Sequence, residues 1–238
     1  MSNVQEAYRH GGFLQVEGWG IDAELIELFI AFDEFHSLSG IRGPLCEIGV
    51  HHGRTLILLG LLAKSGERAI GIDLFEDAQD QNLDASGSGS FVKLRANIDR
   101  HAPGFEFDII KGNSSHLAAS VIAKLQGCRL MHIDGGHTLE VVLNDIALAQ
   151  SVIGLGGIIV IDDYWHSGFP EVQEAVHRYF WTATNIKAVP FMVGKNKIFL
   201  ATPAHRHRLL PFIAERLPPE KRKRVRVLGY DAMCCDPH

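Results

Sequence analysis

Three aspartates follow apolar, strand-like runs at two places in the chain. Asp162 and Asp163 end the run 157–161, and Asp134 ends the run 129–133. Two adjacent carboxylates repel each other unless a positive group lies between them or water solvates both. If the two runs are neighbouring strands of a parallel sheet, the three carboxylates converge at one edge. Three oxygen donors with room for water suit a hard divalent cation such as Mg²⁺.

The same aspartates also have a purely structural interpretation. Asp134 precedes Gly135 and Gly136, which is favourable turn chemistry, and Asp162 or Asp163 could cap a following turn or helix. A cap needs one carboxylate, whereas this edge offers three. The count favours a metal site formed by Asp134, Asp162 and Asp163.

Histidines accompany the aspartates. His137 lies three residues after Asp134, beside the expected metal site. An imidazole there can take a proton near neutral pH, so His137 is the candidate general base and Asp134 belongs to the same catalytic set. His166 is the alternative base and is expected near the substrate or the metal. His132 is expected to be a packed strand histidine.

A turn bracketed by glycines follows another apolar run, residues 45–48. Gly49 and Gly53 let the backbone approach a ligand, and Thr55 begins a helix whose N–H groups point back at it. Ordinary strand-to-helix corners also contain glycine, so this turn is weak on its own. Glu47 adds to it, because a carboxylate inside a strand is costly without a partner. A ligand ammonium group or the backbone of the turn could supply that partner.

Asp73 ends the next strand, where a carboxylate can accept both ribose hydroxyls of a nucleoside. Nicotinamide and S-adenosylmethionine sites share that contact, so Asp73 does not separate them. A dinucleotide fingerprint needs a second glycine at the position that His51 occupies. The turn therefore disfavours an NAD(P)-dependent oxidoreductase.

Short apolar runs alternate with amphipathic stretches along the chain, a pattern typical of βαβ units around a parallel sheet. The expected strands are 45–48, 69–72, 105–110, 129–133 and 157–161, and the expected helices are 55–64, 91–100, 115–125, 139–152 and 170–181. Beyond these, two apolar runs joined by residues 194–196 predict an antiparallel hairpin. We expect an α/β fold, with a Rossmann-like, doubly wound, seven-stranded and mostly parallel sheet that ends in this hairpin.

The chain is expected to form a single domain, residues 1–238, with three parts. These are an N-terminal helical cap (1–42), a catalytic core (43–203) and a C-terminal extension (204–238). Residues 23–38 have the pattern of an extra helix that would cover the sheet or the substrate entrance. The polar segment 75–91 is either a flexible surface loop or a lid that contacts the substrate.

The composition and net charge of the chain indicate which classes of binding partner it disfavours. The formal net charge is −5, which makes the chain a poor candidate for binding nucleic acid. The one basic cluster, residues 221–224, is expected to be a solvated tail. The four cysteines have no disulfide or zinc spacing, and no apolar run is long enough to span a bilayer. We expect a cytoplasmic protein without a membrane partner, and the sequence leaves open whether it is a homo-oligomer.

Four motifs, EIGVHHGRT, GIDLF, MHIDGGHT and GGIIVIDDYW, occur in this order. Together they resemble the class I S-adenosylmethionine-dependent O-methyltransferases. The resemblance covers residues 43–203 and is closest to the bacterial metal-dependent branch with the macrocin-type sugar O-methyltransferases. The catechol O-methyltransferases are more distant, since they carry Asp-Asn where this chain has Asp162-Asp163, and a lysine base at the offset of His137.

The resemblance implies metal-dependent methyl transfer from S-adenosylmethionine to a hydroxyl of a small sugar or catechol-like acceptor. It implies a divalent metal, with Mg²⁺ as the expected ion. The cofactor would lie against residues 47–53 with its ribose on Asp73, its adenine near Ser114 and Ser115, and Asp134 close by. A non-catalytic binding protein on the same fold stays open beside the oxidoreductase.

Overall fold

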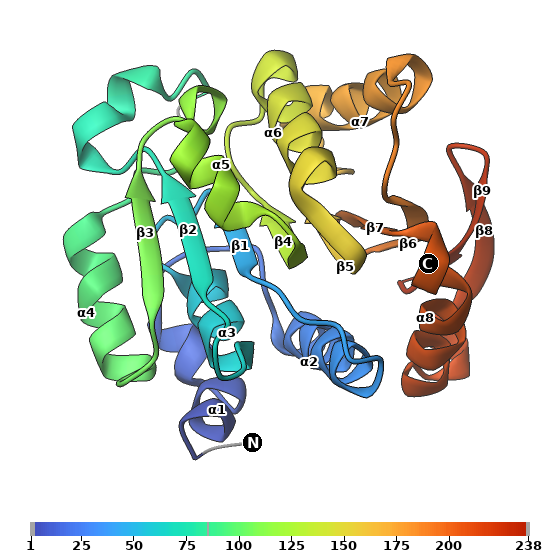
Figure 1. Ribbon diagram of the computed structural model, residues 1–238, viewed down its shortest axis with the longest axis horizontal. Coiled ribbons are helices and arrows are strands. Elements are labelled where there is room, and N and C mark those ends of the chain that lie inside the picture. The colour runs from blue at the N-terminus through green and yellow to red at the C-terminus, as the bar shows by residue number, and fades with distance from the viewer. Residues whose placement is uncertain (1–2, 85, 237–238) are drawn as a thin grey trace.

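The computed structural model describes residues 3–84 and 86–236. Within these residues a mixed sheet has the strand order β3-β2-β1-β4-β5-β7-β6-β9-β8 (Figure 1). The strands are β1 (Leu45–Ile48), β2 (Ala69–Asp73), β3 (Phe107–Lys111), β4 (Cys128–Ile133), β5 (Ile153–Ile161), β6 (Val189–Gly194), β7 (Lys197–Ala201), β8 (Lys223–Val227) and β9 (Tyr230–Cys234).

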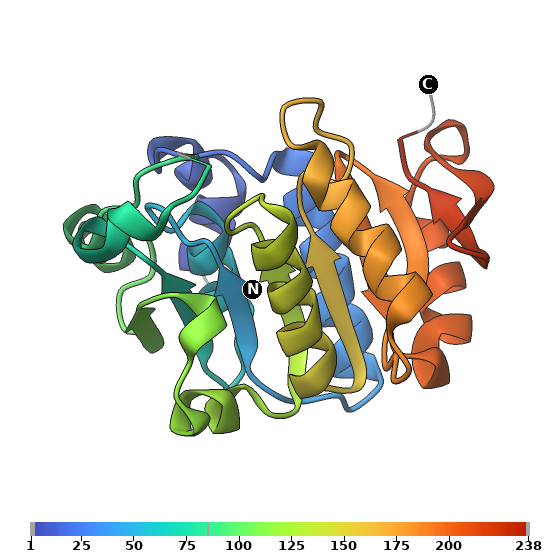
Figure 2. The same ribbon diagram turned by 90° about the horizontal axis from the view of Figure 1, so that it is seen from above.

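Helices cover both faces of the sheet, as Figures 1 and 2 show. The α-helices are α1 (Asn3–Arg9), α2 (Ala23–Leu38), α3 (Arg54–Leu62), α4 (Phe91–His101), α5 (Ala119–Leu125), α6 (Leu139–Val152), α7 (Pro170–Thr182) and α8 (Pro203–Arg216). Helices α1–α4 and α8 share one hydrophobic core with the sheet, and α5–α7 share the other. No helix in the described ranges is both long and apolar enough to cross a membrane.

Strands β1 to β5 are parallel to one another, which confirms the predicted doubly wound α/β fold. Their side chains are apolar almost throughout because both faces of each strand are covered. In β4, Leu130 packs into one core and Met131 into the other, since neighbouring side chains point to opposite faces. The strand order reverses between β1 and β4, and the loops at the carboxyl ends of these strands meet there.

The predicted C-terminal hairpin is confirmed as β6 and β7, which pair antiparallel. The predicted helix 23–38 is also confirmed as α2 with the same bounds. Asp22 caps this helix, because its carboxylate accepts a hydrogen bond from the Leu25 N–H at 2.8 Å.

The prediction of seven strands was wrong, because the sheet has nine. Strand β9 pairs parallel with β6, and β8 pairs antiparallel with β9. The basic cluster 221–224 is therefore not a solvated tail, since Lys223 and Arg224 lie in β8. This strand is at the sheet edge, and exposed basic side chains are typical of edge strands. The basic side chains of β8 obscured its strand pattern in the sequence.

Candidate functional site

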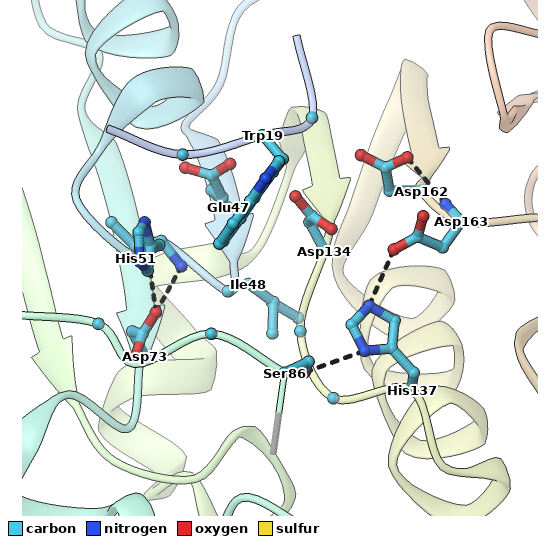
Figure 3. Close-up of a pocket in the computed structure, with 18 of the residues that line it drawn as sticks. Trp19, Glu47, Ile48, His51, Asp73, Ser86, Asp134, His137, Asp162 and Asp163 are labelled. Atoms are coloured by element: carbon cyan, nitrogen blue, oxygen red, sulfur yellow. Dashed lines mark hydrogen bonds and ion pairs between the residues drawn. The ribbon is translucent and has the colours of Figure 1, made fainter. Parts of the chain in front are cut away.

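A cavity of about 880 Å³ lies at the carboxyl edge of the parallel strands (Figure 3). It brings together nine of the eleven predicted site residues: Glu47, Gly49, Thr55, Asp73, Ser114, Asp134, His137, Asp162 and Asp163. His166 also lines it. Gly53 and Ser115 are not lining residues: Gly53 is the N-cap of α3, and Ser115 donates its N–H to the Asn113 side chain.

Gly49 is needed for close packing beneath the cavity. Its φ is 84°, and a Cβ at this position would lie 1.8 Å from the backbone oxygen of Asp134. The turn after β1 therefore touches the loop after β4, and a larger residue would separate them. This contact gives Gly49 a structural role that does not depend on a ligand.

Asp73 holds the turn after β1. Its Oδ2 accepts the N–H groups of Val50 and His51, each at 2.7 Å, and its Oδ1 accepts the Phe75 N–H at 2.8 Å. A carboxylate has about four acceptor sites, so three are used within the chain. The remaining site can take one ribose hydroxyl.

Glu47 and His132 form a buried pair on neighbouring strands. The Oε1 atom of Glu47 lies 3.0 Å from His132 Nδ1, and His132 Nε2 lies 3.6 Å from Asp162 Oδ2. Burial lowers the pKa of His132, but the neighbouring carboxylates of Asp162 and Glu47 outweigh it and raise that pKa to about 9. His132 is packed in its strand as predicted, and its two ring nitrogens face two carboxylates.

Lys197 is the main positive group at Asp162. The Lys197 side chain is 2% exposed, and its ammonium group forms an ion pair with Asp162 Oδ2. Burial raises the pKa of Asp162, but the charges of Lys197 and His132 outweigh it and hold that pKa below its usual range. The sequence interpretation missed Lys197. Its signal was a lysine that begins the apolar strand KIFLA, since a lysine is buried only when it is paired.

Asp163 points away from Asp162 and toward His137 (Figure 3). Its φ of 57° is left-handed, which Asp tolerates better than most residues. Its Oδ1 accepts a hydrogen bond from the Asn196 side chain at 2.7 Å, and its Oδ2 lies 2.9 Å from His137 Nε2. The two adjacent carboxylates thus diverge to different partners, which relieves their repulsion.

Asp134 lies near both of these carboxylates. Burial and the charge of Asp162 raise the pKa of Asp134 well above its usual range. A carboxylate in that situation is stabilised by any cation that approaches it. The donor set therefore fits a divalent metal at this point.

Among residues 3–84 and 86–236, two sets of three residues could each hold a metal ion, because the ligand atoms within each set lie within 4.8 Å of one another. These sets are His132, Asp134 and Asp162, and Asp134, His137 and Asp163. In the first set, His132 is already paired with Glu47, and Asp162 is paired with Lys197. The second is formed by residues that line the cavity. Asp134 and Asp163 are thus better placed for a metal than Asp162, whose role as a ligand stays a prediction.

His137 is held on two sides. Its ring stacks on Phe169 with centroids 3.8 Å apart and an angle of 9° between the planes. On its other side, Asp84 and Ser86 of the segment 75–91 contact Nδ1. Burial lowers the pKa of His137, but the carboxylates of Asp163 and Asp84 outweigh it and raise that pKa above its usual value. Part of the polar segment thus reaches into the site.

Residues 17–22, before α2, cross the cavity from the other side. A Cβ on Gly20 would lie 3.0 Å from Asp134 Oδ2 and 3.3 Å from Asp162 Oδ2, so the backbone passes directly over the carboxylates. The Trp19 ring lies 5.4 Å from the ring of His51, and Figure 3 shows it between His51 and Asp134. Helix α2 itself covers the sheet, and no pattern in the sequence indicated that Trp19 reaches the cavity.

A family model described as a methyltransferase domain matches residues 46–164 of the chain. These residues contain the Gly49 turn, Asp73 and the three aspartates of the cavity. The chain belongs to this methyltransferase family. No curated protein sequence matches this methyltransferase.

Solved structures share the fold of this methyltransferase. The O-methyltransferase NovP has a TM-score of 0.60 at 17% identity, over 76% of this chain and 81% of that one. An O-methyltransferase from Bacillus cereus in complex with SAH has a TM-score of 0.56 at 13% identity, with coverage of 85% and 91%. CalS11, a TDP-rhamnose 3′-O-methyltransferase, has a TM-score of 0.54 at 13% identity, with coverage of 84% and 95%. At these identities the similarity establishes the fold.

Proposed function

We propose that this methyltransferase transfers a methyl group from S-adenosylmethionine to a hydroxyl of a small molecule. The observation that carries the proposal is one cavity that contains both the Asp73 turn and the cluster of Asp134, Asp163 and His137. A cofactor and an acceptor bound at these two places would be neighbours. The SAH-bound relative from Bacillus cereus supports the cofactor, and the sugar-modifying CalS11 supports a sugar acceptor, with a catechol-like acceptor as the alternative.

In this proposal the ribose lies on Asp73 and the adenine near Ser114. Asp134 and Asp163 would hold a divalent metal, expected to be Mg²⁺, with Asp162 as the third predicted ligand. When bound, that metal supplies Lewis-acid activation of the hydroxyl. His137 takes the proton from the acceptor, and the walls of the cavity orient the hydroxyl for in-line attack.

The direct test uses purified protein, methyl-labelled S-adenosylmethionine and a panel of nucleotide sugars, glycosides and catechols. Appearance of label in an acceptor, together with release of S-adenosylhomocysteine, is the expected result. Titration calorimetry with S-adenosylhomocysteine and NAD separates the alternatives. Binding of NAD alone would favour an oxidoreductase, and cofactor binding without transfer to any acceptor would favour a binding protein.

Removal of metal should abolish turnover. Excess chelator is expected to stop methyl transfer, and Mg²⁺ or Mn²⁺ to restore it, because the ligand atoms of Asp134, His137 and Asp163 lie within 4.8 Å of one another and suit a divalent cation. Asp134→Asn should lose this metal response and keep its affinity for S-adenosylhomocysteine, whereas Asp80→Asn, at an exposed position, serves as the control. Full activity in excess chelator would exclude a metal role.

Asp73→Ala should weaken S-adenosylmethionine binding by about 2–4 kcal/mol. The variant removes a charged acceptor for the ribose and also frees the N–H groups of Val50 and His51 that shape the turn. Calorimetry with S-adenosylhomocysteine measures the change, and thermal unfolding shows whether the variant is folded. Unchanged affinity in a folded variant would remove Asp73 from the cofactor site.

A further inference from the structure

Asp84 makes two contacts with one histidine that lies 53 positions away in the chain. Its Oδ2 accepts the backbone N–H of His137 and lies 3.0 Å from His137 Nδ1. The side chains of Asp84 and His137 are 13% and 11% exposed, so water competes weakly for these contacts. A carboxylate at this distance accepts a hydrogen bond from Nδ1–H, which favours the ring form that carries its proton on Nδ1.

The same ring is fixed by two further neighbours. Ser86 Oγ lies 3.1 Å from Nδ1, and Phe169 stacks against the ring face. The Ser86 N–H in turn donates to Asp84 Oδ1 at 2.8 Å, which orients the carboxylate. The ring plane and the position of Nδ1 are therefore both set by residues other than the two acids Asp134 and Asp163, which form the acid cluster.

The opposite nitrogen faces that cluster. His137 Nε2 lies 2.9 Å from Asp163 Oδ2, which is an ion-pair distance, but outside hydrogen-bond geometry. In the ring form with Nδ1–H, the lone pair is on Nε2. A proton acceptor is thus directed into the part of the cavity where Asp134 and Asp163 lie.

The geometry points to Asp84 as a positioning residue, which fixes the His137 ring so that Nε2 is the proton acceptor. This inference rests on the proposed function, since it assigns a support to the proposed base. It also gives part of the segment 75–91 a role in the proton transfer as well as in lining the cavity. The arrangement has the logic of a carboxylate that orients a catalytic histidine and holds its tautomer.

Asp84→Asn provides the kinetic test. Both oxygens of Asp84 accept backbone N–H groups, Oδ2 from His137 and Oδ1 from Ser86, so an asparagine places its NH2 group against one of these donors in either orientation and can no longer hold the ring as the carboxylate does. We expect kcat to fall about 10–100-fold, while KM for S-adenosylmethionine changes less than about twofold. Asp84→Glu, which keeps the carboxylate, should recover part of the loss, and the exposed Asp80→Asn should behave as the wild type.

Nitrogen NMR of histidine-labelled protein tests the inference without turnover. At a pH where the ring is neutral, the wild type should show His137 with a protonated Nδ1 and a bare Nε2, and Asp84→Asn should lose this preference and show both ring forms. His137→Gln assigns the signal. A wild-type ring protonated on Nε2, or a tautomer unchanged in Asp84→Asn, would overturn the inference.

The two measurements also separate this inference from the proposed function. If no acceptor is methylated but the tautomer changes in Asp84→Asn, the positioning holds and the proposed reaction fails. If Asp84→Asn weakens cofactor binding and leaves both kcat and the tautomer unchanged, Asp84 only orders its own segment. Asp84→Ala, which removes the carboxylate and introduces no amide, repeats the test if Asp84→Asn does not fold.

Discussion

Replacing His137 with alanine should lower kcat by about 10²–10⁴-fold with little change in affinity for S-adenosylhomocysteine. The expected size is that of a lost general base, and the cofactor is expected on the other side of the cavity. The base must be neutral to act, so activity of the wild type should fall as pH decreases. Because nearby carboxylates raise the pKa of His137, this fall should begin above the usual histidine range. The variant should lose this acidic limb of the pH–rate profile.

A small decrease in kcat with the acidic limb intact would place the base elsewhere. His166 is then the next candidate, because it lines the same cavity and stacks on Phe169 with ring centroids 4.7 Å apart. Such a result would also favour a phenolic acceptor. A phenol ionises on a metal with less help, whereas an aliphatic sugar hydroxyl is a far weaker acid and needs the base.

Replacing Lys197 with methionine should lower the free energy of unfolding by about 3–5 kcal/mol. The variant leaves the 6%-exposed Asp162 without the buried ammonium group that neutralises it. Chemical denaturation measures the change. The double variant Lys197→Met with Asp162→Asn should recover part of the loss, because no uncompensated carboxylate remains.

Lys195 is the matched control for this prediction. It lies two positions away in the β6–β7 turn, and its side chain is 22% exposed and paired with Glu24. Lys195→Met should change the free energy of unfolding by no more than about 1 kcal/mol, as expected for a pair near the surface. Equal effects at both lysines would show that the Lys197 pair does not stabilise the fold.

The parallel part of the sheet could be predicted from sequence because its strands are covered on both faces. Runs such as Gly157 to Ile161 are apolar throughout, and amphipathic helical patterns separate them. Strand β8 lacks this signal. This strand lies at the edge of the sheet, so its sequence KRVRV is shaped by contact with solvent as much as by contact with the core. Its partner β9 is held in the sheet by pairing with β6.

The carboxylates of the site could be predicted because each follows a recognisable strand, so the topology alone places them together. Their partners could not be predicted in the same way. Lys197 reaches Asp162 across a strand pairing, Asp84 reaches His137 from an irregular segment, and Trp19 comes from a segment before the core. These contacts depend on side-chain direction and loop path, for which the sequence has no periodic signal.

The pairing of β9 with β6 affects how the chain folds during its synthesis. Strand β6 lies between β7 and β9 in the sheet, yet residues 195–229 separate it from β9 in the chain (Figure 1). During synthesis, β6 and β7 can pair soon after they leave the ribosome, while the other edge of β6 has no partner. An apolar strand with an open edge is prone to pair with another chain. Ribosome pausing within residues 195–229 would therefore prolong the interval in which nascent chains can aggregate.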